Sequence, residues 1–212
     1  MDERLTDLPA RALVERLATS DPIPGGGSAA ALAGAMAAAL VQMVVALTTG
    51  RPMAAEHERD LTEIGLAAAG LQSELLQLTE LDATAYDAVV RARRMPRDGQ
   101  PEREARAVQL AATTREATRV PLETTRRAAN VLTLAERLAP IGNRNAVSDV
   151  GVAALLAAAA MRGAALNVRI NLPYLPEDED LRETAAAELD QLFDGLEDRE
   201  RAIRRSVEDR LG

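Results

Sequence analysis

The sequence contains no cysteine, lysine or tryptophan, and its 212 residues include only one phenylalanine and two tyrosines. Without cysteine the chain forms no disulfide and offers neither a thiol nucleophile nor a thiolate ligand for a metal. Without lysine it offers no amine for Schiff-base chemistry, and all 25 basic residues are Arg. The single His, His57, lies in a polar stretch, so no group of His residues has the spacing of a metal site.

The shortage of aromatic residues excludes a core built on large anchors. Ala, Leu, Glu and Arg dominate instead, and these residues favour helices, whereas runs of β-branched residues are scarce. The net charge of −8 argues against nucleic acid as a partner, because phosphate binding requires a basic face. The composition therefore predicts an all-α protein with a core of small side chains.

One segment is long and uncharged enough to be tested as a membrane span. No charged residue occurs in residues 22–50, but Ala and Gly dominate the segment and Asp2, Glu3 and Asp7 precede it. Ala and Gly insert weakly into a bilayer, and a signal peptide begins with basic residues. We therefore expect a buried helix of a cytoplasmic protein, with no membrane association.

Proline and glycine divide the sequence into about six helices. The pattern predicts helices over residues 9–18, 28–48, 52–94, 101–138, 145–171 and 177–210, with no strand between them. We expect residues 1–212 to form a single-domain antiparallel helical bundle. The second and fifth helices have almost no polar face, which predicts that they are central or pressed against a second subunit in a homodimer.

A run of three glycines, Gly25, Gly26 and Gly27, precedes Ser28 at the start of the second helix. Glycines let a backbone approach a ligand closely, and the free N–H groups of a helix start attract a carboxylate or phosphate. A turn that is capped by Ser28 explains the same residues equally well. The pattern is neither a P-loop nor a dinucleotide-binding fingerprint, since no Lys follows and no strand precedes it.

A polar cluster precedes the fifth helix in an Ala-rich part of the chain. It contains Asn143, Asn145, Ser148 and Asp149. Asn145 is a plausible N-cap and Asp149 falls in the first helical turn, where the helix dipole favours an anion. Two explanations of the cluster remain open: its residues only cap the helix, or they form a binding site.

Asp82 lies on an otherwise apolar stripe, one helical turn from Tyr86. A buried carboxylate is costly, so Asp82 must be paired, shifted in pKa or functional.

A further polar group lies near the end of the fifth helix, where Asn167 and Asn171 are one turn apart. Arg169, between them, offers a clamp for a carboxylate. A cation near a helix C-terminus also has a purely electrostatic explanation.

Two of these stretches resemble one known family. The run from Pro24 to Gly34, together with residues 142–151 and 163–171, is similar to the cyclodeaminase/cyclohydrolase family, which includes the C-terminal part of formiminotransferase-cyclodeaminase. The stretches around Asp82 and Pro121 occur between them in the family's order. The resemblance covers about residues 5–200.

The resemblance implies an all-helical dimer that acts on tetrahydrofolate one-carbon adducts. Members release ammonia from 5-formiminotetrahydrofolate, or hydrolyse 5,10-methenyltetrahydrofolate, with a tetrahydrofolate derivative as substrate and no tightly bound cofactor. It implies Asp82 as general acid and base, Asp149 as the residue that orients it or stabilises the cationic carbon, and a separate formiminotransferase as a partner. The substrate-binding residues so implied are Gly25, Gly26, Gly27, Ser28, Tyr86, Asn143, Asn145, Ser148, Asn167, Arg169 and Asn171.

The chain departs from the family at Leu81, where an acidic residue often precedes the aspartate, and at Arg144, where Pro is usual. The change at Leu81 keeps a second hypothesis open, that of a folate-binding or structural helical dimer without catalysis. The sequence does not decide between the deaminase and cyclohydrolase reactions.

Overall fold

The computed structural model describes residues 4–177 and 180–211, and α-helices account for most of them. The order of the α-helices is α1 (Ala10–Leu17), α2 (Gly26–Thr48), α3 (Glu58–Arg93), α4 (Gln100–Leu138), α5 (Val147–Asn171), α6 (Asp180–Phe193) and α7 (Leu196–Leu211). No strand occurs in the described ranges. The all-α prediction is therefore confirmed.

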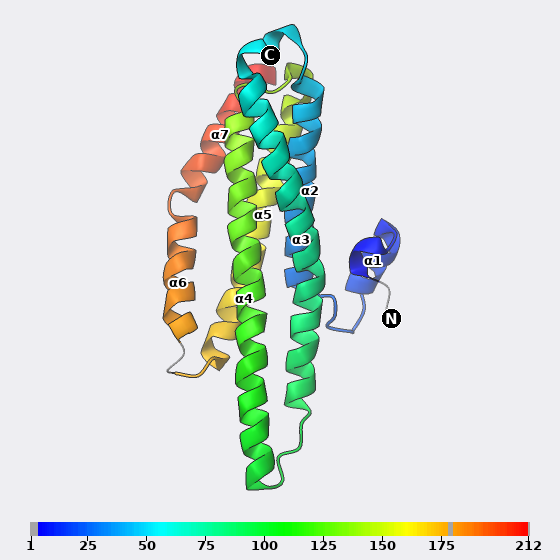
Figure 1. The fold of residues 1–212 in the computed structure, drawn as a ribbon, viewed down its shortest axis with the longest axis vertical. Coiled ribbons are helices and arrows are strands. Elements are labelled where there is room, and N and C mark those ends of the chain that lie inside the picture. Colours follow the sequence, from blue (N-terminus) through cyan, green and yellow to red (C-terminus); the bar gives the residue numbers. More distant parts are fainter. Residues whose placement is uncertain (1–3, 178–179, 212) are drawn as a thin grey trace.

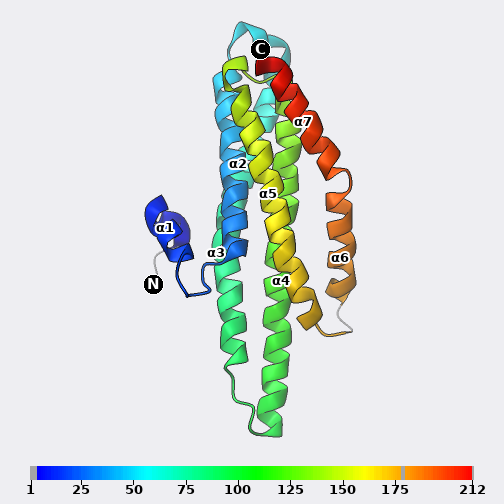
Figure 2. The same cartoon turned by 180° about the vertical axis from the view of Figure 1, so that it is seen from behind.

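The four long helices α2, α3, α4 and α5 form an antiparallel bundle (Figure 1). Each packs along two of the others, because α2 contacts both α3 and α5, and α4 contacts the same two helices. Helices α3 and α4 are the longest, and their connection projects beyond the start of α2 and the end of α5 (Figures 1 and 2). Helix α7 packs against α5, and α6 packs against α4. The start of α2 and the end of α5 consequently lie together, part-way along the α3–α4 pair.

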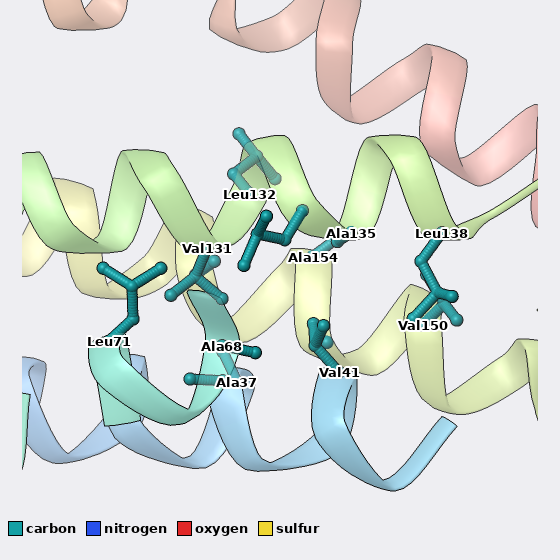
Figure 3. Close-up of a cluster of buried hydrophobic side chains, with 14 of the residues drawn as sticks. Ala37, Val41, Ala68, Leu71, Val131, Leu132, Ala135, Leu138, Val150 and Ala154 are labelled. Carbon is teal, nitrogen blue, oxygen red and sulfur yellow. The ribbon is translucent and has the colours of Figure 1, made fainter. Parts of the chain in front are cut away.

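Small apolar side chains fill the space between these helices, as the composition predicts. Figure 3 shows ten of them, contributed by all four long helices and facing one another. Ala37, Ala135 and Val150 are fully buried in this cluster, as are Val131 and Leu132. Because the side chains are short, the helix backbones approach closely, and stability comes from many small contacts.

The helix boundaries agree with the sequence prediction except at four places. Helix α5 begins at Val147, two residues later than expected, after a 3-10 turn. Helix α2 begins at Gly26, two residues earlier than expected. A 3-10 turn, Pro52–His57, precedes α3. The predicted C-terminal helix is divided into α6 and α7 at Gly195, whose φ of 67° lies in the left-handed region that favours glycine.

Helix α4 contains Pro121, which has no N–H group to donate to the carbonyl of Ala117 one turn earlier. The structure supplies another donor, since Nδ2 of Asn171 lies 2.8 Å from that carbonyl oxygen. Asn171 is the last residue of α5. A proline-induced gap in one helix is therefore closed by the end of its neighbour.

The uncharged helices are only partly covered by the chain itself. Two segments, Gly26–Thr48 and Arg144–Tyr174, are long and apolar enough to cross a membrane by length and composition alone, and 50% of the most apolar window in each is buried. This half-burial in a bundle is typical of a soluble helical domain. The outer side carries exposed large apolar side chains, here named the α2–α5 apolar face: Met36, Met43, Leu47, Val152, Leu155, Leu166 and Ile170.

Candidate active site

A cavity of about 250 Å³ lies where α2 begins and α5 ends, against the middle of α3. We name it the Asp82 cavity. Its lining comes from the turn before α2, the start of α2, and helices α3, α4 and α5: Pro22, Ile23, Gly25, Gly26, Gly27, Asp82, Ala83, Tyr86, Ala117, Asn167, Ile170 and Asn171. Seven of the sequence-predicted site residues are on this lining, and they come from segments that are far apart in the chain.

Asp82 projects from α3 toward the first turn of α2. The Ser28 hydroxyl donates a hydrogen bond to Oδ2 of Asp82 over 2.9 Å, and the backbone N–H of Ser28 adds a second. The first N–H groups of a helix have no partner within the helix and carry partial positive charge. The carboxylate therefore occupies the place of a capping group, although it comes from a different helix.

The interpretation of Ser28 as the cap of α2 is wrong. The N-cap position is Gly25, which makes no side-chain capping hydrogen bond, and the Ser28 hydroxyl is a donor to Asp82 rather than an acceptor from the backbone. The start of α2 does receive a carboxylate. The carboxylate is the protein's own.

Burial raises the pKa of Asp82 above its ordinary value of 3.8, and the two hydrogen bonds from Ser28 partly oppose that shift. Burial disfavours the charged form, whereas donors to the carboxylate favour it. The carboxyl group is thus held in one position with a weakened acidity. A group in this condition can exchange a proton with a molecule bound in the cavity.

Gly27 is required by the position of this carboxylate. A Cβ atom at residue 27 would lie 2.0 Å from Oδ1 of Asp82 and 2.6 Å from its Cγ. Any side chain there would displace the carboxylate. Gly26 differs, because a Cβ atom at that position would meet its nearest neighbour, Nδ2 of Asn167, at 3.8 Å, an ordinary contact.

Three further predicted residues lie in the same cavity. Tyr86 is 37% exposed and lines it from α3. Asn167 and Asn171 line it from α5, where Nδ2 of Asn167 donates to the carbonyl of Gly163 over 2.9 Å and Nδ2 of Asn171 donates to that of Ala117. Both of these hydrogen bonds use the amide nitrogen of the asparagine, so the amide oxygen of each side chain is available to a bound molecule.

Arg169 lies elsewhere. Its guanidinium carbon is 5.7 Å from the centre of the Phe193 ring on α6, and the residue is not on the lining of the Asp82 cavity. The prediction that Arg169 clamps a substrate carboxylate in this site is not supported by the position of the residue. Its place near the end of α5, over an aromatic ring, is explained by cation–π attraction and the helix dipole.

The second predicted motif lies at the opposite end of the bundle. The backbone N–H of Asn143 donates to the Thr48 hydroxyl, and its Nδ2 donates to the Leu47 carbonyl, so the motif contacts the last turn of α2. Helix α2 has 23 residues, so its two ends are about 33 Å apart. Within one chain, Asp149 in the first turn of α5 is therefore too far from Asp82 to orient it.

The capping prediction for this motif is shifted by two residues. Oδ1 of Asn143 accepts the backbone N–H of Asn145 over 3.0 Å, so Asn143 and not Asn145 is the capping residue of a 3-10 turn, Arg144–Ala146. Asn143 is buried, whereas Asn145 and Ser148 are exposed. Asp149 does lie in the first turn of α5, as predicted.

Sequence reasoning missed the apolar part of the lining. Ile23, Ala83, Ala117 and Ile170 carry no chemical signal in the sequence, because an apolar residue beside a cavity looks the same as one in a core. No group of three or more His, Asp or Glu within residues 4–177 and 180–211 is arranged to hold a metal ion. Among the residues that line the cavity, Asp82 carries the carboxyl group.

Comparison with known proteins finds relatives along nearly the whole chain. Over 180 residues it is 42% identical to a methenyltetrahydrofolate cyclohydrolase of Methylorubrum extorquens, an alignment that covers 85% of this chain and 86% of that protein. It is 31% identical over 177 residues to the formimidoyltransferase-cyclodeaminase of Mus musculus, but spans only 33% of that protein's length.

A solved structure has the same fold. The crystal structure of formiminotetrahydrofolate cyclodeaminase from Thermotoga maritima matches with a TM-score of 0.85 and 27% sequence identity, over 97% of this chain and 98% of that one. The family model described as formiminotransferase-cyclodeaminase matches residues 9–191, which include the glycine turn, Asp82 and both asparagine motifs. With that match and the full-length relative at 42% identity, the chain belongs to the formiminotransferase-cyclodeaminase family.

Proposed function

We propose that this protein is a folate one-carbon enzyme that hydrolyses 5,10-methenyltetrahydrofolate to 10-formyltetrahydrofolate. The observation that carries the proposal is the partly buried carboxylate of Asp82, held by Ser28 at the start of α2 and facing a cavity. The relative with 42% identity over most of both chains is named for this hydrolysis. The substrate is a tetrahydrofolate derivative, and the mechanism below uses no other cofactor.

The reaction needs a group that accepts one proton and then returns it. A water oxygen attacks the methenyl carbon between the two folate nitrogens, and its proton passes to the Asp82 carboxylate. The carbon is then tetrahedral and carries a hydroxyl group. The hydroxyl proton leaves as the carbonyl forms, the bond to the ring nitrogen breaks, and Asp82 returns its proton to that nitrogen. One methenyl cation and one water become one formyl compound and one released proton.

The position of Asp82 suits both proton transfers of this hydrolysis. The methenyl compound is a cation, and a carboxylate beside its reacting carbon stabilises it. Ser28 holds the carboxylate in one orientation, so that little reorganisation is needed when the proton moves. The raised pKa makes the protonated form accessible for the second half.

Release of ammonia from 5-formiminotetrahydrofolate is the second candidate reaction. The solved structure that matches this fold from end to end is named for that activity. The same carboxyl group would protonate the departing amine as the second nitrogen attacks the formimino carbon. This reaction requires a formiminotransferase as a source of substrate, which we expect to be a separate cytoplasmic protein.

The decisive experiment follows the absorbance band of methenyltetrahydrofolate with pure protein. Faster loss of the band than in buffer establishes the hydrolase, whereas formation of the band and of ammonia from 5-formiminotetrahydrofolate establishes the deaminase. Asp82→Asn keeps the shape of the side chain but removes the proton carrier, so turnover should fall at least about 100-fold while folate binding remains. If wild-type protein binds folate but matches the buffer in both reactions, the non-catalytic hypothesis replaces this one.

We further propose that the protein is a homodimer paired through the α2–α5 apolar face. Leu155, Leu166 and Ile170 are each more than 60% exposed on this face, and a patch of large apolar side chains on a soluble protein marks an interaction surface. A two-fold axis across the middle of the face sets α2 antiparallel to its copy. The start of one α2 then lies beside the end of the other, and Asp149 of the partner subunit approaches Asp82.

A mixing experiment tests this shared site. If each site uses Asp82 from one chain and Asp149 from the other, Asp82→Asn and Asp149→Asn variants are each inactive alone. After unfolding and refolding together, half of the dimers are mixed, and each has one intact site, so activity recovers to about a quarter of wild type. Absence of recovery, from dimers shown to be mixed, means that no site combines the two residues.

A further inference from the structure

A second cavity, of about 390 Å³, lies beyond the Asp82 cavity toward the α3–α4 connection. We name it the arginine cavity. Its lining comes from α3, α4 and the turn after α5: Arg93, Arg106, Leu110, Thr114 and Tyr174. None of these residues was singled out as a site residue from the sequence.

The charge of this cavity is unusual for the protein. Two arginines line it and no carboxylate does, although the chain as a whole carries a net charge of −8. Among the residues that the structure describes, neither Arg93 nor Arg106 has a carboxylate within salt-bridge distance, whereas Arg126, Arg127, Arg137, Arg162 and Arg199 each do. Within the part of the chain that the structure describes, no carboxylate therefore compensates the positive charge of this cavity.

The contacts of these two arginines leave hydrogen-bond donors unused. Nη2 of Arg106 donates to the carbonyl oxygen of Arg93 over 3.3 Å, but its Nε is buried and has no partner. Arg93 lies over the Tyr174 ring, with its guanidinium carbon 5.7 Å from the ring centre. A buried donor without an acceptor costs free energy, and a guanidinium is shaped to bind a carboxylate through two hydrogen bonds.

The arginine cavity shares no lining residue with the Asp82 cavity but follows it along three elements. Thr114 is one turn before Ala117 on α4, and Tyr174 follows Asn171 by three residues. On α3, Arg93 lies 11 residues after Asp82, a distance of about 17 Å along the helix. This separation is comparable to the reach of a folate beyond its reacting carbon, which ends in an aminobenzoyl ring and one or more glutamates.

We propose that the arginine cavity binds the carboxylates of the glutamate tail of the substrate. The proposal rests on the function proposed above. With the reacting carbon at Asp82, the tail extends past Tyr86 to the guanidinium groups of Arg93 and Arg106, which bind a tail carboxylate. The cavity thereby sets the preference of the enzyme for tail length.

Another group of arginines provides a matched comparison. A neighbouring cavity, which shares Pro22, Ile23 and Ala83 with the Asp82 cavity, is lined by Arg16, Arg91 and Arg94, but also by Asp21 and Asp87. Arg91 forms a salt bridge of 3.1 Å with Asp87. The charge of Arg91 is therefore compensated by Asp87. Arg91→Gln removes one positive charge two residues from Arg93 without changing the lining of the arginine cavity.

The test measures how much a longer tail lowers the KM. Kinetics are recorded with mono- and triglutamate forms of methenyltetrahydrofolate for wild type, Arg106→Gln, Arg93→Gln and Arg91→Gln. In wild type the triglutamate has the lower KM. Loss of a charge-assisted hydrogen bond should reduce this advantage about tenfold in the first two variants, and Arg91→Gln should keep it. The proposal is overturned if wild type shows no advantage, if Arg91→Gln alone loses it, or if all three variants lose it equally.

A binding measurement separates this proposal from the function on which it rests. Calorimetry with p-aminobenzoyl-triglutamate, which lacks the reacting carbon, needs no turnover. Binding by wild type that weakens about tenfold in Arg106→Gln supports the tail site even if the protein hydrolyses nothing. No binding by wild type rejects the site even if hydrolysis is rapid. Melting curves of wild type and of each variant check that every protein compared is folded.

Discussion

Substitution of Gly27 by Ala tests the described position of the Asp82 carboxylate most directly. The added Cβ atom would lie 2.0 Å from Oδ1, 2.6 Å from Cγ and 2.8 Å from Oδ2 of Asp82. All three distances are shorter than van der Waals contact allows, so the carboxylate must move. Gly27 does not have a positive φ, and the backbone therefore accepts Ala without strain.

Two opposing effects set the change in stability. Moving the carboxylate breaks its hydrogen bond with Ser28, and a hydrogen bond to a charged group contributes about 1.5–3 kcal/mol. Ala instead of Gly in a helix returns up to about 1 kcal/mol. The net loss is about 1–2 kcal/mol, which lowers the melting temperature of a chain of this size by roughly 2–8 °C. Displacement of the catalytic group should lower kcat about 100-fold.

Gly26→Ala is the matched control. It adds the same methyl group one residue earlier, on the lining of the same cavity, where the nearest atom would be 3.8 Å away. We expect it to melt at or above the wild-type temperature and to keep most of the activity. Methenyltetrahydrofolate absorbance and thermal unfolding by circular dichroism measure both effects. If Gly27→Ala has the kcat and the melting temperature of wild type, the Asp82 carboxylate does not lie against the first turn of α2.

Three further predictions follow from the same contacts. Ser28→Ala removes a donor that lowers the pKa of Asp82, so the acidic limb of the kcat–pH profile should move to higher pH; an unmoved limb means that another group titrates there. Because burial raises the pKa of Asp82 above 3.8 in the folded state, the native protein binds this proton more tightly than the unfolded chain, and the contribution of Asp82 to stability falls as pH rises through the folded-state pKa. Urea unfolding at several pH values should therefore show the stability of wild type relative to Asp82→Asn declining from acid to neutral pH, and a rising difference contradicts the shift. Asn171→Ala leaves the carbonyl of Ala117 without a donor and should cost about 1–2 kcal/mol; in a double-mutant cycle, Pro121→Ala, which restores a backbone N–H in α4, should make Asn171→Ala nearly neutral, and additive effects would show that the amide does not compensate for the proline.

The sequence was sufficient to predict the helices and one side of the site. Pro and Gly mark the ends of α1, α2 and α4 within about two residues, since these residues restrict or free the backbone locally. Asp82 was identified because a carboxylate on an apolar stripe needs an explanation. Its partner was not, because Ser28 lies 54 residues earlier in the chain and only tertiary packing brings the two together.

The separation of Asp149 from Asp82 within one chain has a physical explanation. In an antiparallel bundle, α2 and α5 run in opposite directions, so the start of α5 must lie beside the end of α2. The predicted antiparallel fold therefore already placed Asp149 far from the glycine turn of the same chain. The family resemblance assigned both motifs to one site, so this distance was not taken into account. The arginine cavity had no comparable signal, because Arg93 and Arg106 belong to a set of 25 arginines scattered over the sequence.

The acidity of Asp82 reflects two requirements that act in opposite directions. As a substitute for a helix cap, the carboxylate is stabilised by the donors of Ser28, and these donors alone would hold its pKa below 3.8. A carboxylate of that kind is a poor proton carrier, because it does not take up a proton near neutral pH. Burial in the bundle has the larger effect and raises the pKa. In the proposed mechanism, the small side chains that let α2 and α3 approach closely therefore contribute to the chemistry, because they bury the carboxyl group that takes up and returns the proton.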